Sequence, residues 1–451
     1  MSVKPAAAEN PELPRSLGFT GVLGQAIAGT APTATPAVNV ALVFVAVGSG
    51  SWLVFLFATL AILLVALNIL PMARTGSAAG SLSDFVGRGL GQTWRLVAGW
   101  ALLLAYLSTA VAVLAACVGY MATLLGALHL GMPAALLTAI VGGFASLLVS
   151  RNVRLSTGVM LAFELLSIAL VLVLCAIILI RQGGAMDLSQ LRLEGLSLSG
   201  INGALLIGIL SFAGFETAAV LGDETKAPLR VIPRALLATP LLTGLFFVFS
   251  SYVLVLGFNQ YHVDVAATST PLDVLADRIQ RPELGILISF GATISLFGCT
   301  VATLLATSRI AYALARQDAL PAFLAKVDAR HFLPRNAVMG AVAIVLVAAV
   351  AMAFVVPPDT LYDWFGSFAT FGFVLAYLLT CISTPVYLHS RGELRTSTVA
   401  LSVAGVLVLL YVLGASIYPA PAAPLNFLPW IFLGLLVAGT LLSFALRGRR
   451  S

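Results

Sequence analysis

Twelve long apolar segments, separated by short polar ones, constrain this chain more than any other feature of its sequence. A helix that crosses a bilayer needs about 20 mainly apolar residues, and the segments match or exceed that length. The predicted spans are 19–47, 51–71, 94–126, 132–150, 157–181, 200–221, 235–257, 284–315, 336–356, 361–388, 397–418 and 427–446. Lipid offers no hydrogen-bond partners to the backbone, and a helix satisfies the backbone polar groups within the segment itself. The sequence therefore predicts an all-α polytopic membrane protein.

The composition leads to the same class. Charged residues are 9% of the 451 residues and hydrophobic residues are 60%. A soluble domain carries about 25% charged residues, so this chain cannot cover a water-facing surface. We expect no cleavable signal peptide, because the polar N-terminus is followed by an apolar segment too long for one. The four cysteines lie in apolar segments without metal-site spacing, and we expect no metal, no cofactor and no nucleic-acid partner.

The basic residues are distributed unequally between the two sets of loops. Of the 24 lysines and arginines, four lie in one set, namely Arg181, Arg192, Arg278 and Arg281. The other twenty lie near the two termini and in the alternate loops. Because basic residues accumulate on the cytoplasmic side, a multi-pass protein of the cell (cytoplasmic) membrane with both termini in the cytoplasm is predicted. The net charge of +6 then reflects orientation rather than an acidic partner.

Two of the spans contain residues that interrupt a helix. The first span reads GTAPTATP from Gly29 to Pro36, and each proline removes a backbone donor. The sixth reads SFAGFE from Ser211 to Glu216. Its glycine weakens a helix by roughly 1 kcal/mol, and its carboxylate costs at least about 2.5 kcal/mol at membrane depth. Proline kinks and small-residue packing explain either segment alone, but the two together favour a binding site.

The two interrupted spans are five apart, which is typical of transporters built from inverted repeats. A unit of five helices is odd, so its second copy enters the membrane from the opposite side. The predicted organisation is a cytoplasmic tail, a five-span repeat, a second five-span repeat, two additional spans and a second cytoplasmic tail. These parts are residues 1–18, 19–181, 200–388, 397–446 and 447–451.

Two loops carry a family resemblance. The sequence GDETKAPLRVIPRA at 222–235, directly after SFAGFE, resembles the signature of the amino acid–polyamine–organocation (APC) permease superfamily. The sequence SRIAYALARQDALP at 308–321 resembles the stretch that follows span eight in the same family. The resemblance covers nearly the whole chain. It implies the five-plus-five inverted-repeat (LeuT-like) fold with two extra helices, and membrane transport of amino acids, polyamines or related solutes.

By this resemblance, the substrate lies between the interrupted parts of spans one and six. The implied substrate-binding residues are Ala28, Gly29, Thr30 and Ala31 on span one and Ser211, Phe212, Ala213 and Gly214 on span six. The resemblance implies that amides of span one hold a carboxylate, which a helix N-terminus favours. It also implies that carbonyls of span six face an ammonium group, with Phe212 as an aromatic wall or gate. Tyr106 in span three is either a further contact or a packing residue.

Glu216 and Glu164 are the candidates for coupling or gating. A low-dielectric site favours the neutral form of a carboxyl group, so Glu216 is suited to respond to protons. Its alternative is a purely structural, hydrogen-bonded side chain. Glu164, the one charge inside the fifth span, either couples or lies at a helix interface. Some proton-coupled relatives carry a lysine in this span. This chain has none there, so that lysine mechanism does not transfer to it. Proton coupling through a carboxyl group is one interpretation, and sodium coupling stays open.

These features favour a secondary active transporter that moves amino acids or related small amines by alternating access, with proton coupling or by exchange. A polyamine or organic-cation transporter and a non-transporting solute sensor on the same scaffold are the alternatives. We expect no second intramembrane acid on spans one, three, eight or ten, which favours a small zwitterion over a polyamine. An enzyme is disfavoured, because two separate carboxylates form no catalytic constellation. The oligomeric state stays open.

Overall fold

The computed structural model describes residues 17–75, 82–151, 157–183, 187–192, 197–221, 225–268, 270–327 and 334–448. The regular structure of these residues is helical, apart from one isolated β-bridge. The long uninterrupted helices are α3 (Ser51–Thr75), α5 (Gln92–Ala127), α6 (Ala134–Ser150), α7 (Thr157–Arg181), α11 (Pro228–Gln260), α13 (Pro282–Arg316), α14 (Arg335–Ala353), α15 (Pro358–Ser390), α16 (Thr396–Ala415) and α17 (Leu428–Gly448). Span one consists of α1 (Phe19–Thr30), η1 (Thr35–Asn39) and α2 (Val40–Val47), and span six of α9 (Leu198–Leu210) and α10 (Thr217–Val220). Short helices in the connections are α4 (Leu82–Leu90), α8 (Leu188–Arg192) and α12 (Pro271–Arg278).

Each of the twelve predicted spans coincides with one or more of these helices. Nine helical runs in the described residues are long and apolar enough to cross a membrane, and one of them, Phe19–Thr75, contains two predicted spans. Two shorter apolar helices, Ala134–Ser150 and Gly200–Leu210, correspond to spans four and six. The prediction of a polytopic helical membrane protein is confirmed. Residues 1–16 and 449–451 of the predicted tails lie outside the described residues.

The outward faces of the bundle are apolar. Large hydrophobic side chains point away from it on α14, α16 and α17, as Val347, Leu407 and Leu441 do, with more than 60% of each side chain exposed. A helix that is apolar all round needs either a protein core or lipid around it. These helices have protein on one side only, so lipid is the environment that their composition suits.

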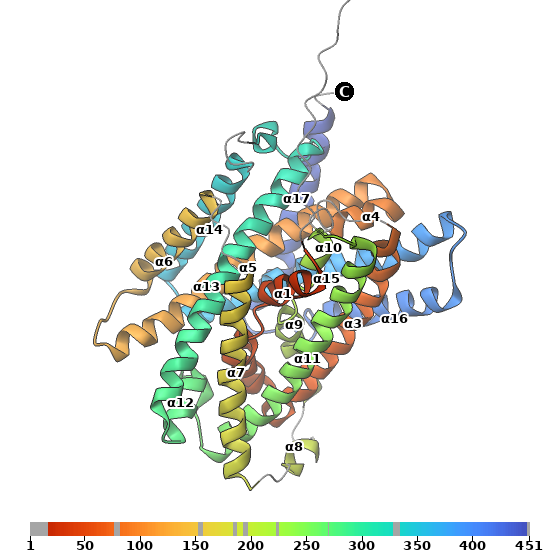
Figure 1. Ribbon diagram of the computed structural model, residues 1–451. Coiled ribbons are helices and arrows are strands. Elements are labelled where there is room, and N and C mark those ends of the chain that lie inside the picture. The colour runs from red at the N-terminus through yellow and green to blue at the C-terminus, as the bar shows by residue number, and fades with distance from the viewer. Residues whose placement is uncertain are drawn as a thin grey trace, which may run out of the picture.

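Helices that are five spans apart pack against each other. Thus α3 contacts α11, α5 contacts α13, and α6 contacts α14. Figure 1 shows α6 and α14 side by side on one flank of the bundle, with α16 on the opposite flank. Two inverted repeats related by a pseudo-two-fold axis would bring these particular pairs together. Helix α15 packs against α5 and α9 and so completes the centre of the bundle.

Both predicted helix breaks are present. In span one, α1 ends at Thr30, Ala31 has a left-handed backbone with φ of +46°, and helical structure resumes at Thr35. In span six, residues 211–216 form turns between α9 and α10, and Gly214 has φ of +103°. The two breaks touch, because a Cβ atom added to Gly214 would lie 2.5 Å from the carbonyl oxygen of Gly29.

The beginning of span one is joined to the loop after span six. Leu17 and Thr225 form the isolated β-bridge, and the N–H of Lys226 donates to the carbonyl of Leu17 at 3.0 Å. Spans one and six therefore run in opposite directions through the bundle. Residues 222–224 of this loop lie outside the described residues.

Candidate functional site

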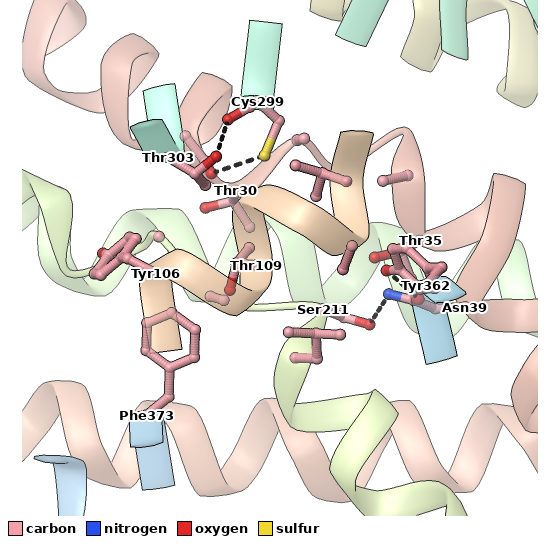
Figure 2. A pocket seen from close by; sticks show the side chains of 18 residues that line it. Thr30, Thr35, Asn39, Tyr106, Thr109, Ser211, Cys299, Thr303, Tyr362 and Phe373 are labelled. Carbon is pink, nitrogen blue, oxygen red and sulfur yellow. Dashed lines mark hydrogen bonds between the residues drawn. The ribbon is translucent and has the colours of Figure 1, made fainter. Parts of the chain in front are cut away.

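A small cavity of about 30 Å³ lies where the two breaks meet. Seven of the predicted residues line it, namely Gly29, Thr30, Ala31, Tyr106, Ser211, Ala213 and Gly214. Helices α5, α13 and α15 complete the walls with residues such as Thr109, Thr303 and Phe373, which Figure 2 shows around the breaks. A water molecule needs at least about 10–15 Å³ measured in this way, so the cavity has room for one or two waters.

One end of the cavity is polar. The side-chain amide of Asn39 donates to the Ser211 hydroxyl at 2.8 Å, and the Tyr362 hydroxyl donates to the Asn39 carbonyl oxygen at 2.6 Å. Figure 2 shows Thr35 beside this group. These contacts join span one, span six and α15 at the cavity wall, so a ligand in the cavity would meet neutral hydroxyl and amide groups.

The other end of the cavity is aromatic. The rings of Tyr106 and Phe373 meet edge to face, with their centroids 5.1 Å apart. The rest of the lining includes small apolar side chains, among them Ala34, Ala112 and Val113. Among the described lining residues none is charged. The cavity thus combines a neutral polar end with an apolar body.

Glu216 lies directly behind the aromatic end and is buried. One of its carboxylate oxygens accepts from the Tyr106 hydroxyl at 2.6 Å. The other accepts from the Tyr377 hydroxyl at 3.0 Å and from the N–H of Gly214 at 3.1 Å. The carboxylate therefore ties the span-six break to α5 and α15. All three contacts are donated to it, so none needs a proton on the carboxyl group.

Glu164 is buried on the opposite side of the span-one break and does not line the cavity. One oxygen accepts from the N–H of Thr33 at 2.9 Å and from the Thr33 hydroxyl at 2.7 Å. The other accepts from the Ser295 hydroxyl at 2.5 Å. Glu164 thus joins α7, the residues after α1, and α13. These contacts place Glu164 at a helix interface. A role of Glu164 in coupling stays a prediction.

The backbone donors of the span-one break are engaged within the protein. The N–H of Ala31 donates to the Ile27 and Ala28 carbonyls at 3.1 and 3.3 Å, and so closes the end of α1. The N–H groups of Ala34 and Thr35 bond to carbonyls three residues earlier. Gly29 and Thr30 lie in the last helical turn, where amides bond to the preceding turn. The expectation of free amides at Gly29–Ala31 is therefore not met in this conformation.

Three further expectations need correction. Phe212 does not form a cavity wall, because its ring is fully buried against Phe247 of α11, with a centroid distance of 5.1 Å. Span ten does carry an acid near its start. Asp363 follows the cavity residue Tyr362, and the Ser367 hydroxyl donates to it at 3.4 Å. An acid on span ten weakens the preference for a zwitterion over a polyamine, because that preference assumed no second intramembrane acid. Ala28 also lies outside the lining.

Several residues of the site were not singled out from the sequence. Asn39, Tyr362 and Phe373 line the cavity, and Tyr377 and Ser295 bind the two carboxylates. Asn39 offered a usable signal, since an asparagine within an apolar span needs partners in lipid. The aromatic and serine residues offered none, because such residues are common in membrane helices.

Comparison with known proteins gives a consistent result. The family model "Amino acid permease" matches residues 21–423. The chain is similar to the branched-chain amino acid permease BcaP of Bacillus subtilis, with 23% identity over 64% of this chain and 65% of that protein. It is 26% identical to the low-affinity putrescine importer PlaP of Escherichia coli over 71% of each chain. It is 28% identical to the serine/threonine exchanger SteT of Bacillus subtilis over 46% of each chain.

Proposed function

Because the chain belongs to the amino acid permease family, we propose that it is a secondary active transporter and that the cavity between the two helix breaks is its substrate site. The family and the relatives are transporters, which indicates a protein that is not an enzyme. The carrying observation is the direct contact of Gly214 with Gly29 beside the cavity. Non-helical backbone at membrane depth needs a functional or structural partner, and a transported solute supplies one.

The leading substrate class is a small neutral amino acid. The uncharged lining, the hydroxyl and amide groups at Ser211 and Asn39, and the apolar walls fit a compact solute with one polar end. The cavity volume of about 30 Å³ favours a solute without a long side chain. Binding requires the breaks to separate, because the cavity holds only one or two waters.

A small organic amine is the second candidate. The engaged amides around Ala31 favour a ligand without a carboxylate, and carbonyl groups at the breaks suit an ammonium donor. Glu216 near one end and Asp363 near the other are acidic side chains that do not line the cavity. The similarity to a putrescine importer agrees with this candidate. Amino acids and amines therefore both belong in the first substrate panel.

Transport by alternating access, with coupling through Glu216, completes the proposal. Glu216 contacts Tyr106, which lines the cavity, and the N–H of Gly214 in the break. A change in the charge of this carboxyl group would alter its hydrogen bonds to α5, to α15 and to the break itself. Proton coupling would use such a group, whereas exchange does not require one. Orientation with the termini in the cytoplasm is part of the same proposal.

The test is uptake and exchange of radiolabelled amino acids and amines by proteoliposomes, with and without an imposed pH gradient. Accumulation driven by the gradient supports proton coupling, whereas exchange alone supports an exchanger. No movement of any solute in either assay would refute the transporter. Ser211→Ala is expected to weaken uptake through a raised KM, because Ser211 lines the cavity. The matched control is Ser250→Ala, since Ser250 is buried and bonds only to its own helix at Phe247.

A further inference from the structure

The Thr35 hydroxyl is a buried polar group at the cavity wall. Thr35 is 1% exposed, and it lies beside Asn39 and Tyr362 at the polar end of the cavity (Figure 2). In the part of the chain that the structure describes, its hydroxyl group makes no hydrogen bond. Buried side-chain polar atoms in proteins mostly have a partner. A hydroxyl that faces a cavity without one indicates that a bound molecule supplies the partner.

The other hydroxyl and thiol groups of the lining bond within the protein. The hydroxyls of Thr30, Thr109 and Thr303 each donate to the carbonyl four residues earlier, at 2.8 to 2.9 Å. The Cys299 thiol, which also lines the cavity, donates to a backbone carbonyl of span one at 3.9 Å. The remaining lining hydroxyls that donate to protein atoms are those of Tyr106, Ser211 and Tyr362. Among the described lining residues, Thr35 is therefore the exception.

The break in span one explains the exception. A threonine in a helix bonds readily to a carbonyl three or four residues earlier. For Thr35 these carbonyls belong to Pro32 and Ala31, which lie in the break. Both already accept from backbone N–H groups, the first from Thr35 itself at 3.3 Å and the second from Ala34 at 2.9 Å. The same interruption that forms the cavity thus leaves the Thr35 hydroxyl available.

Thr35 and Asn39 present neighbouring polar groups to the cavity. They begin and end a π turn, in which the Val40 N–H bonds to the Thr35 carbonyl, and single π turns are frequent at functional sites. A primary amide has two N–H groups, and the structure describes a bond for one of those of Asn39, to Ser211. The two residues together offer a hydroxyl that can donate and accept and an amide N–H that can donate, all without charge.

We propose that Thr35 and Asn39 form a polar subsite that selects a small solute carrying a hydroxyl group, either a hydroxy amino acid or an amino alcohol. The proposal rests on the proposed function, because it specifies the substrate class of the same cavity. Thr35 exchanges hydrogen bonds with the hydroxyl group of the solute, and Asn39 donates a further one. Thr35 is thereby a specificity-determining residue of the site.

A neutral group suits this subsite better than a charged one. A charged group that leaves water needs a countercharge and hydrogen bonds, and the described lining residues carry no charge. A hydroxyl group has one donor and accepts through its lone pairs, which matches what Thr35 and Asn39 offer. A solute with hydrogen or methyl in place of the hydroxyl leaves Thr35 unpaired. A site that bonds to a substrate hydroxyl discriminates strongly against an analogue without it.

Matched pairs of probes test the subsite. The pairs are L-serine with L-alanine, L-threonine with L-valine, and ethanolamine with ethylamine, and the members of each pair differ in the hydroxyl group. Each probe is titrated into the purified protein, and its Kd is obtained from the rise in unfolding temperature, because a ligand of the folded form stabilises it. In at least one pair the hydroxyl-bearing member is expected to bind about tenfold more tightly or better, which corresponds to about 1.4 kcal/mol.

The pairs also distinguish the two kinds of solute. A preference confined to serine or threonine identifies a hydroxy amino acid, and one confined to ethanolamine identifies an amino alcohol. Equal affinity for both members of every pair, or binding of none of the probes, would overturn the proposal.

Thr35→Val retains the shape of the side chain and removes its hydroxyl group. The variant should abolish the preference by weakening the hydroxyl-bearing probe alone, whereas Thr35→Ser should retain the preference. The control is Thr239→Val, because Thr239 is buried outside the cavity lining and donates to the Ala235 carbonyl at 2.9 Å. The control should leave the preference as it is. A preference that persists in Thr35→Val would contradict the assignment.

The stability of the protein without ligand gives a second readout. No bond to a described residue is lost in Thr35→Val, and removal of an unpaired buried hydroxyl is not destabilising. The unfolding temperature of this variant should therefore be unchanged or higher. A lower one would mean that the Thr35 hydroxyl is bonded within the protein, which would overturn the proposal.

The binding assay needs no vesicles and no gradient, so its result is separable from that of the uptake assay. Hydroxyl-selective binding without uptake of the bound solute by proteoliposomes would refute the transporter and retain the subsite. Uptake of L-alanine, L-valine and ethylamine as efficient as that of their hydroxyl-bearing counterparts would retain the transporter and refute the subsite.

Discussion

Gly214→Ala probes the contact between the two helix breaks. Gly214 has φ of +103°, a conformation that L-residues with a side chain rarely adopt. The added Cβ would lie 2.5 Å from the oxygen and 2.8 Å from the carbon of the Gly29 carbonyl, and 3.2 Å from the Thr30 nitrogen. All three atoms belong to the backbone, so no side-chain rotation relieves the clash. The alanine methyl group must push the breaks apart.

The expected cost has two parts. A left-handed backbone costs an ordinary residue roughly 1–2 kcal/mol. Inserting a methyl group into a filled space typically costs about 1–3 kcal/mol. Together they predict that Gly214→Ala lowers the free energy of unfolding by about 2–5 kcal/mol. Uptake should fall as well, because the displaced atoms of Gly29 and Gly214 line the cavity.

The measurement is thermal unfolding of the purified protein in detergent, followed by a dye that becomes fluorescent on reaction with thiols. The four free cysteines are buried and react as the protein unfolds. The control is Gly203→Ala in α9 of the same span, where an added Cβ has no atom within 4 Å. Alanine in place of an interior helix glycine is favourable by roughly 0.5–1 kcal/mol. Wild-type unfolding temperature and uptake in Gly214→Ala would refute the packing argument.

Three other predictions address the site. Glu216→Gln should flatten the dependence of uptake on pH over roughly pH 5 to 8. The control Glu283→Gln alters an exposed ion pair and should leave that dependence as it is. Unchanged pH dependence in Glu216→Gln would leave Glu216 a packing residue. Asn39→Ala removes the partner of two buried hydroxyl groups and should lower stability by about 1–3 kcal/mol, so an unaltered thermal unfolding profile would contradict the assigned bonds. A transported solute should slow alkylation of Cys299, and equal rates with and without it would place the substrate elsewhere.

The sequence was sufficient to predict the spans and the positions of the two breaks. Length and hydropathy determine a membrane helix almost alone, so all twelve spans coincide with helices. The breaks were predictable because Pro32 has no N–H and Gly214 tolerates positive φ. Both properties are local and need no knowledge of the neighbouring helices.

The contacts around the breaks were not predictable in the same way. Once the helix is interrupted, the 3.6-residue period no longer shows where a side chain points. Phe212 accordingly packs on α11 instead of facing the cavity. Glu164 meets Thr33 and Ser295, each 131 residues away in sequence, and no local pattern encodes that meeting. The engaged amide of Ala31 likewise depends on its left-handed backbone.

The small volume of the cavity links substrate binding to the conformational change. Glu216 and Glu164 both hold their hydrogen bonds to neighbouring helices, Gly29 touches Gly214, and the remaining space of about 30 Å³ holds one or two waters. An amino acid or amine larger than this can enter only if the two broken spans separate. The protein must therefore expend part of the binding free energy of the substrate on opening contacts that it makes with itself. A ligand shifts the equilibrium between joined and separated breaks only by as much as it prefers the separated form. The solutes that are transported should therefore be those that form bonds to the separated breaks, and a fit to the cavity alone should not be sufficient.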